Sequence, residues 1–208
     1  FNAFTRHLKY FCVAPSAYFK KVILMKKHFA VLALGLTALT CSPVFAKTPF
    51  ALTSPDFIPN QAVAQKNMLN TFGCTGGNVS PELNWRGAPA GTKSFVLTMY
   101  DPDAPTGSGW WHWVVYNIPA SASGLPAGAG AGEGLPTGAL QGNNDGSDPH
   151  YGGPCPPQGA KAHRYVVTLN AVNVEKLDLP PNASPAFVGF MTGMHRVGQT
   201  SFTVKVKR

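Results

Sequence analysis

YDPDAPTGSGWWHWVVYNIPA, residues 100–120, joins an Asp-Pro-Asp sequence to a histidine flanked by tryptophans. The run that follows His112 is rich in β-branched and aromatic residues, which favours a strand. A plain surface loop would carry more Ser, Asn and Lys, and a plain core strand would not start beside Asp101 and Asp103. The stretch therefore predicts a strand with a functional site at its start.

Runs of the same composition recur along the chain, each bounded by Gly or Pro. The last of them alternates Phe202, Val204 and Val206 with polar residues, which predicts a half-exposed strand near a sheet edge. Residues 121–153 are mostly Gly, Pro, Asn and Asp, so they should form a long surface excursion. The predicted strands are SFVLTMY (94–100), WHWVVYNI (111–118), RYVVTLNAV (164–172) and SFTVKVK (201–207).

One helix is predicted near the C-terminus. Ser184 can cap it, Pro185 suits its first position, and Gly198 should end it. Several strands with one helix favour a mainly β protein, an antiparallel two-sheet β-sandwich with a C-terminal helix. The apolar residues that recur at helical spacing are Phe187, Phe190, Met191, Met194 and Val197.

The N-terminal part predicts an exported protein. MKKHFAVLALGLTALTCSPVFA, residues 25–46, has two lysines, an apolar stretch and a small-residue end, as a secretory signal peptide does. Cleavage is expected after Ala46, with residues 1–24 as an upstream extension and residues 47–208 as a single domain. A membrane anchor and a lipoprotein modified at Cys41 are the alternatives, although the apolar stretch is short for a bilayer.

The formal charge of +8 does not indicate nucleic-acid binding. Six of the 17 Lys and Arg residues, and none of the nine acids, precede Lys47. The remaining chain carries only +2, and it has no basic stripe with interleaved aromatic residues.

Two cysteines, Cys74 and Cys155, remain after the signal peptide. In an exported chain without CxxC spacing, they are most simply one disulfide. No cationic cluster is evident beside either thiol, so the disulfide is expected to be structural rather than redox-active.

Side-chain alternation places several polar groups together. His163, Tyr165 and Val167 share one face of their strand, and the two aspartates follow another strand. With His112, these groups would form a small pocket of carboxylates, imidazoles and a phenol. Each residue also has an ordinary interpretation: the aspartates as turn residues, the histidines as structural hydrogen-bonding groups and Tyr165 as core.

Other chemistries have weaker support, and no cofactor is expected. The sequence lacks GxSxG, GxxxxGK[ST] and HExxH, and GAGAGEG at residues 128–134 does not have GxGxxG spacing. A divalent metal held by Asp101, Asp103, His112 and His163 is a less favoured alternative, which would make the protein a metal-dependent hydrolase.

DPDAP, WWHWVVYNIPA, GALQGNND, YGGPCPPQG and HRYVVTLNAV, in this order and spacing, resemble the phosphatidylethanolamine-binding protein family. The likeness is to its bacterial Raf kinase inhibitor-like branch, in the exported form that carries a sequence such as FGCTGGNVSP. It covers residues 49–208. One departure is Gly146, where the family usually has an aromatic residue.

The resemblance implies a two-sheet β-sandwich with a C-terminal helix, a Cys74–Cys155 disulfide and often a homodimer. It implies a non-enzymatic, periplasmic binding protein for phosphate or a phosphoethanolamine headgroup. The alternative is a protein that inhibits a protease or kinase through its surface, with the partner unknown. The implied pocket consists of Asp101, Ala104, Pro105, His112, Gly153, Pro156, His163 and Tyr165.

Two bare aspartates would repel an anion, so the acids should not face it directly. We expect Asp101 or Asp103 to hydrogen-bond one nitrogen of His112 or His163, which favours the imidazolium and leaves the other nitrogen for the ligand. Affinity for phosphate should then rise as the pH falls from about 8 to 6.

Overall fold

The computed structural model describes residues 48–180 and 183–208. The signal peptide and upstream extension expected from the sequence lie outside them. The elements are β1 (Ala51–Thr53), η1 (Gln65–Asn67), β2 (Leu83–Arg86), β3 (Ser94–Asp101), β4 (Trp110–Pro119), β5 (Gly124–Leu125), η2 (Ala129–Ala131), β6 (Leu140–Gly142), β7 (His163–Val172), α1 (Pro185–His195) and β8 (Arg196–Val206).

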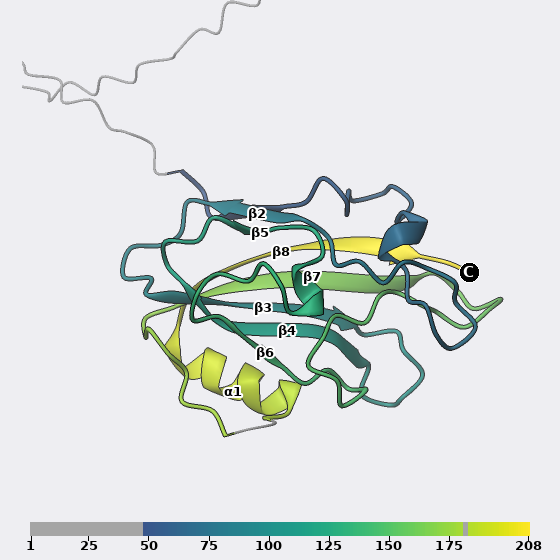
Figure 1. Ribbon diagram of the computed structural model, residues 1–208. Helices are drawn as coiled ribbons and strands as arrows, with labels where there is room; N and C mark the ends of the chain where they lie inside the picture. Colours follow the sequence, from purple (N-terminus) through teal and green to yellow (C-terminus); the bar gives the residue numbers. More distant parts are fainter. Residues whose placement is uncertain (1–47, 181–182) are drawn as a thin grey trace, which may run out of the picture. The chain divides into compact units, whose positions relative to one another are not determined.

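The strands form two antiparallel sheets. One has the order β1-β2-β5 and the other the order β6-β4-β3-β7-β8. Figure 1 shows β2 and β5 on one side of the larger sheet and α1 on the other. The mainly β, two-sheet fold expected from the sequence is confirmed, and β8 lies at a sheet edge as expected.

The central strand β3 is buried on both faces. Phe95, Leu97 and Met99 pack between the two sheets, while Val96 belongs to the cluster beneath α1. A strand covered on both faces needs an almost continuous apolar sequence, and SFVLTMY provides it. The central strand is thus rigidly held along its whole length, up to Asp101 at its end.

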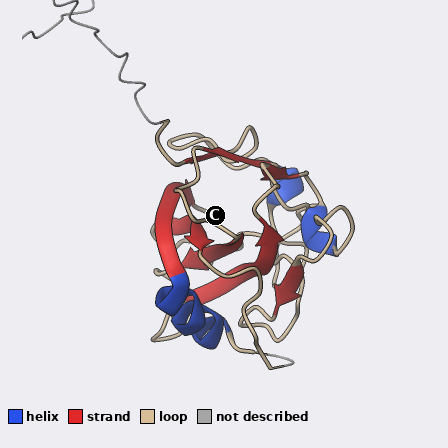
Figure 2. Ribbon diagram, turned by 90° about the vertical axis from the view of Figure 1, so that its left-hand side faces the viewer, coloured by secondary structure: helices blue, strands red, loops and turns tan. Residues whose placement is uncertain are grey.

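The helix begins where the sequence predicts but ends earlier. The hydroxyl of Ser184 accepts a hydrogen bond from the backbone N–H of Phe187 at 3.2 Å, and Pro185 occupies the first turn. The chain passes directly into β8 at Arg196 (Figure 2). Gly198 is therefore not the helix stop: it pairs with Ala171 in the sheet, and a Cβ there would meet Pro89 at 2.4 Å.

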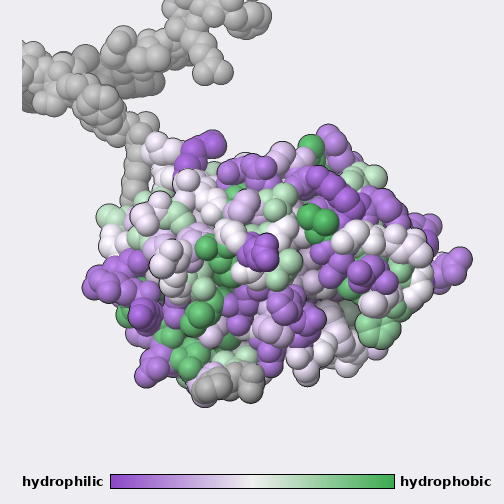
Figure 3. All heavy atoms as spheres, in the orientation of Figure 1, coloured by the Kyte–Doolittle hydropathy of each residue, from purple (hydrophilic) through white to green (hydrophobic). Residues whose placement is uncertain are grey.

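The apolar residues at helical spacing do not all pack against the sheet, although Met191 does contact the cluster beneath α1. Val188 and Thr192 are buried against the sheet, whereas Phe187, Phe190 and Met194 are exposed. Figure 3 shows hydrophobic side chains on the surface over α1. Apolar spacing identifies residues that share a face, but the smaller side chains are the ones that fit between α1 and the sheet.

Within residues 48–180 and 183–208, the helices are all too short or too polar to cross a bilayer.

Candidate functional site

The polar groups singled out in the sequence meet at one end of the sandwich. Asp101 ends β3, while His112 and His163 stand at or near the start of β4 and β7. Because these neighbouring strands are antiparallel, the end of β3 lies beside the starts of its two neighbours. The site residues border a hollow of about 450 Å³, which every expected pocket residue except Asp103 lines: Asp101, Ala104, Pro105, His112, Gly153, Pro156, His163 and Tyr165.

A buried hydrogen-bonded pair, His163 and Asp101, lines the hollow. His163 donates from Nδ1 to Oδ2 of Asp101 at 2.7 Å, and the residues are 6% and 2% exposed. The other carboxylate oxygen, Oδ1, accepts the backbone N–H of Asp103 at 2.8 Å. Asp101 thus orients the ring of His163 through Nδ1, as the sequence argument expected, and Nε2 is left for a ligand.

His112 is held in the same manner by the backbone. Its Nδ1 donates to the carbonyl oxygen of Gly152 at 2.8 Å, because a carbonyl can only accept. Burial lowers the pKa of His112 below its ordinary value, and this outweighs the opposing effects of Gly152 and Asp101. The ring is therefore neutral near pH 7, and the expectation of an ordinary or raised pKa is wrong for His112.

Tyr165 forms an apolar wall beside these rings. It is 1% exposed, and its ring packs edge-on against His112 with centroids 5.1 Å apart. Burial, together with the charge of Asp101, raises the pKa of Tyr165. The phenol therefore stays protonated and can donate a hydrogen bond but cannot act as a base near neutral pH.

Asp103 does not line the hollow, which corrects the sequence expectation. Its two carboxylate oxygens accept from Nη2 and Nε of Arg164 at 2.8 and 2.9 Å. These hydrogen bonds lower the pKa of Asp103 to about 2. The turn after Pro102 separates the two aspartates, so one serves the pocket and the other a surface ion pair.

Further residues, which were not predicted to line the pocket, complete its walls. Residues 69–72 bring Leu69 and Phe72 to one side, and Trp110 and Tyr151 line another. Gly153 permits this packing, because a Cβ there would meet the backbone oxygen of Asn67 at 2.5 Å. The density of Gly and Pro in YGGPCPP was the available signal, but it did not identify residues 69–72 as the facing segment.

The hollow carries little positive charge. No Lys or Arg is among its lining residues within the described chain, and its carboxylates are Asp101 and Asp148. The two imidazoles are therefore the groups that can become cationic there. Nor does the described part of the chain gather three His, Cys, Asp or Glu side chains in a cluster suited to a metal.

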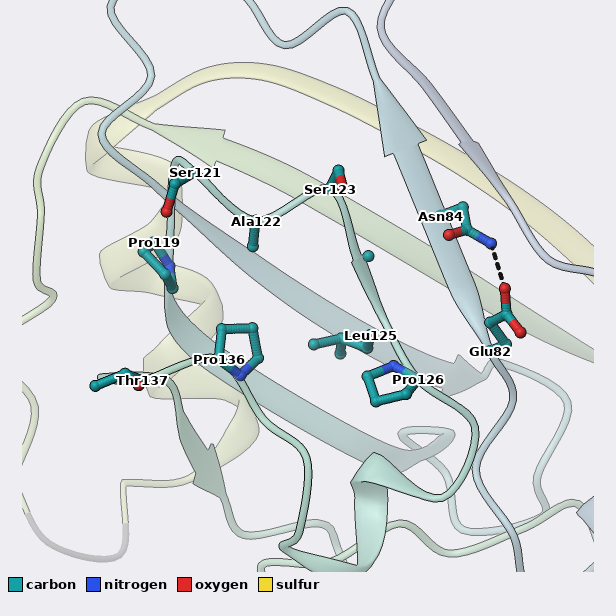
Figure 4. A pocket seen from close by; sticks show the side chains of 11 residues that line it. Glu82, Asn84, Pro119, Ser121, Ala122, Ser123, Leu125, Pro126, Pro136 and Thr137 are labelled. Atoms are coloured by element: carbon teal, nitrogen blue, oxygen red, sulfur yellow. Dashed lines mark hydrogen bonds between the residues drawn. The ribbon is translucent and has the colours of Figure 1, made fainter.

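A second hollow of about 700 Å³ lies beside β5 (Figure 4). Its lining contains one carboxylate, Glu82, whose Oε1 accepts from Nδ2 of Asn84 at 2.8 Å. Prolines and small side chains make up most of the rest. No imidazole or cation lines it among the described residues, so the candidate site is the hollow at the ends of β3, β4 and β7.

The expected disulfide is confirmed. Cys74 and Cys155 are joined, with their Cα atoms 6.1 Å apart. Cys155 lines the hollow, and the bond ties residues 71–74 to the segment that contains Gly153.

The antiparallel sandwich and the imidazole-lined hollow define a β-sandwich binding protein. The family model described as "Phosphatidylethanolamine-binding protein" matches residues 59–207. The chain belongs to the phosphatidylethanolamine-binding protein family, and the resemblance seen in the sequence is confirmed.

Relatives agree with this assignment. YbcL of Escherichia coli is 47% identical over 156 residues, which cover 74% of this chain and 85% of that protein. The structure of YbcL, described as a new member of the mammalian PEBP family, matches with a TM-score of 0.74 and 45% identity over 78% of this chain and 99% of that chain.

Two more distant relatives widen the comparison. The homologue CT736 of Chlamydia trachomatis has a TM-score of 0.65 at 28% identity, covering 76% of this chain and 97% of that chain. A protein of Mycobacterium tuberculosis, described as the putative lipoprotein LppC, is 36% identical over 143 residues, or 69% of this chain and 65% of that protein.

Proposed function

We propose that this protein is a non-enzymatic binding protein whose pocket holds a phosphate or the phosphate of a phosphoethanolamine headgroup. The observation that carries the proposal is the arrangement of the two imidazoles. Both Nδ1 atoms are engaged, one by the carboxylate of Asp101 and one by the carbonyl of Gly152. Both Nε2 atoms are thereby left for a ligand in the hollow that the rings line, and each can donate to an anion when its ring takes up a second proton on binding.

The charge of the hollow favours a ligand of low charge. A dianion would need compensation from two cations, and the described lining offers only the two histidines. One protonated imidazole matches the single negative charge of a phosphodiester. Asp148 at the rim, with a side chain 58% exposed, supplies a carboxylate for the ammonium group of ethanolamine.

The same arrangement argues for binding rather than catalysis. Catalysis by acid and base needs a group whose pKa lies near the working pH. The raised pKa of Tyr165 moves this group away from that role.

We further propose that the protein acts in the periplasm after cleavage near Ala46. The disulfide requires an oxidising compartment, and the relative described as a lipoprotein is consistent with export. Residues 25–46 provide the signal peptide in this proposal.

Calorimetric titration with glycerophosphoethanolamine tests the pocket. The wild-type protein should bind, and the His112→Gln and His163→Gln variants should each weaken binding about tenfold or more, since each removes one hydrogen bond to a charged group. His195→Gln is the matched control, because His195 ends α1 and is not among the residues that line the hollow. Failure of the wild-type protein to bind, or equal loss in the control, would refute the proposed function.

A further inference from the structure

The disulfide lies between a pocket wall and a group of cations. Nη1 of Arg208 is 2.7 Å from Sγ of Cys74 and 3.2 Å from Sγ of Cys155. The main-chain oxygen of Arg208 accepts the backbone N–H of Gly159 at 3.1 Å, which positions the residue. A guanidinium thus touches the disulfide, although 134 positions separate Arg208 from Cys74 in sequence.

Further cations lie near Cys74, in a hollow that shares no lining residue with the candidate pocket. Lys205 and Lys207 line a hollow of about 560 Å³ together with Cys74 and Arg208. No carboxylate side chain is among its lining residues within the described chain. The electrostatic environment of Cys74 therefore favours a thiolate, and a thiol of lowered pKa is a better leaving group in disulfide exchange.

The disulfide also holds a wall of the candidate pocket. This wall belongs to the loop of residues 69–78, which contains Cys74. At the start of the loop, the backbone N–H of Leu69 donates to the carbonyl oxygen of Pro154 at 3.1 Å. Its end is held by Asn78, whose Oδ1 accepts the N–H of Gly153 at 2.8 Å. Between these anchors, the disulfide links the tip, residues 70–75, to the segment around Cys155. Asn70, Thr71 and Phe72 of the tip line the pocket.

We propose that the Cys74–Cys155 bond is a site of thiol–disulfide exchange with a dithiol reductant, and that its reduction loosens the tip and weakens ligand binding. Cys155 is the more exposed of the two cysteines, and Cys74 lies nearer the guanidinium. The structural role expected from the sequence rested on the absence of a nearby cation, and Arg208 supplies one. The second half of this proposal rests on the proposed function.

The exchange conserves atoms and electrons. A thiolate of the reductant attacks Sγ of Cys155, and Sγ of Cys74 leaves with the bonding electron pair as a thiolate beside Arg208. The second thiol of the reductant loses its proton and attacks the reductant sulfur of the mixed disulfide, so that Cys155 leaves as a thiolate. The reductant is oxidised to its disulfide, and the two cysteines gain two electrons and then bind protons according to pH.

The redox half is tested by equilibrating the protein with mixtures of reduced and oxidised dithiothreitol and counting free thiols by alkylation and mass spectrometry. Arg208→Gln should lower the equilibrium constant for reduction about tenfold, equivalent to about 30 mV. Arg208→Lys should retain most of the wild-type value, because it keeps the charge. Lys93→Gln, which removes an exposed cation at the opposite end of β3, is the control and should leave it unchanged. Equal reducibility of wild type and Arg208→Gln would overturn this half.

The coupling half compares glycerophosphoethanolamine affinity in oxidised wild type and in the Cys74→Ser/Cys155→Ser variant. The variant should bind at least about threefold more weakly, and equal affinities would overturn the coupling. Hydrogen exchange on reduced wild type is a second measurement, in which the amides of residues 70–75 should exchange faster than in the oxidised protein. Unchanged exchange there would also count against the coupling. If oxidised wild type does not bind, the proposed function and the coupling both fail, while the Arg208 comparison still decides the redox half.

Discussion

The carboxylate of Asp101 should set the pH dependence of ligand binding. It accepts from Nδ1 of His163 at 2.7 Å in a site where both residues are buried. A negative charge at this distance stabilises the imidazolium more than a neutral amide does. In Asp101→Asn the ring would be oriented by an amide oxygen, but its positive charge would lose this support.

The amide also cannot replace both carboxylate oxygens. Oδ2 accepts from His163 and Oδ1 accepts from the backbone N–H of Asp103. An asparagine has one acceptor oxygen, so one of these two donors loses its partner. We expect Asp101→Asn to lower the free energy of unfolding by about 1–3 kcal/mol.

The expected loss of affinity follows from the same interaction. A hydrogen bond to a charged group contributes about 1.5–3 kcal/mol, so weakening this one should lower the affinity about tenfold where binding requires the imidazolium. At a pH high enough to remove the imidazolium, the carboxylate no longer adds this stabilisation, so the two affinities should converge. Wild-type affinity should rise as the pH falls, and the rise should be shallower in the variant.

Calorimetric titration between about pH 5 and 8 measures this slope. Glycerophosphoethanolamine is the suitable probe, because a phosphate monoester changes its own charge with a pKa of about 6 and a phosphodiester does not. Asp103→Asn is the control, since that carboxylate pairs with Arg164 outside the hollow. A wild-type slope in Asp101→Asn, or the same loss in the control, would refute the role of Asp101.

Four other expectations follow from the sequence and the structure. The lowered pKa of His112 means that the unfolded chain takes up a proton on this ring at a higher pH than the folded protein does. The free energy of unfolding without ligand should therefore fall as the pH drops below about 6.5. Urea titrations should show a shallower fall in His112→Gln, and an unchanged slope would contradict the shift. Gly153→Ala should destabilise the fold by about 1–3 kcal/mol, because its Cβ would meet backbone atoms of Asn67 and Leu69; an unchanged urea midpoint would show that the backbone gives way. Intact-mass analysis of exported protein should give a first residue of Lys47, and a lipidated or longer chain would contradict that cleavage. The homodimer expected from the resemblance stays a prediction, which sedimentation velocity tests and a monomer mass would refute.

The strands that carry the site could be predicted from sequence, because strand formation there depends on the composition of each segment and of its ends. Residues 94–100, 111–118 and 164–172 combine β-branched and aromatic composition with Gly or Pro at their ends, and all three are strands. The shared face of His163 and Tyr165 follows from the two-residue period of a strand and is confirmed by their burial. The short strands β1, β2, β5 and β6 were missed, since two to four residues contain too little periodicity.

The site residues were recognised from local motifs, but their partners depend on the fold. The sequence left open which aspartate meets which histidine. The turn at Pro102 and the pairing of β3 with β7 bring Asp101 to His163 and Asp103 to Arg164.

The end of the helix and the surroundings of the disulfide were decided only by tertiary structure. Periodicity placed Val197 on the helix, yet sheet pairing from Arg196 onward placed it in β8. The cation beside Cys74 was likewise hidden, because Arg208 reaches it only after β8 pairs with β7. Local sequence determined which segments are strands and which residues share a face; pairing between distant segments determined which charges meet, because such contacts depend on strand register across the whole sheet rather than on neighbouring residues.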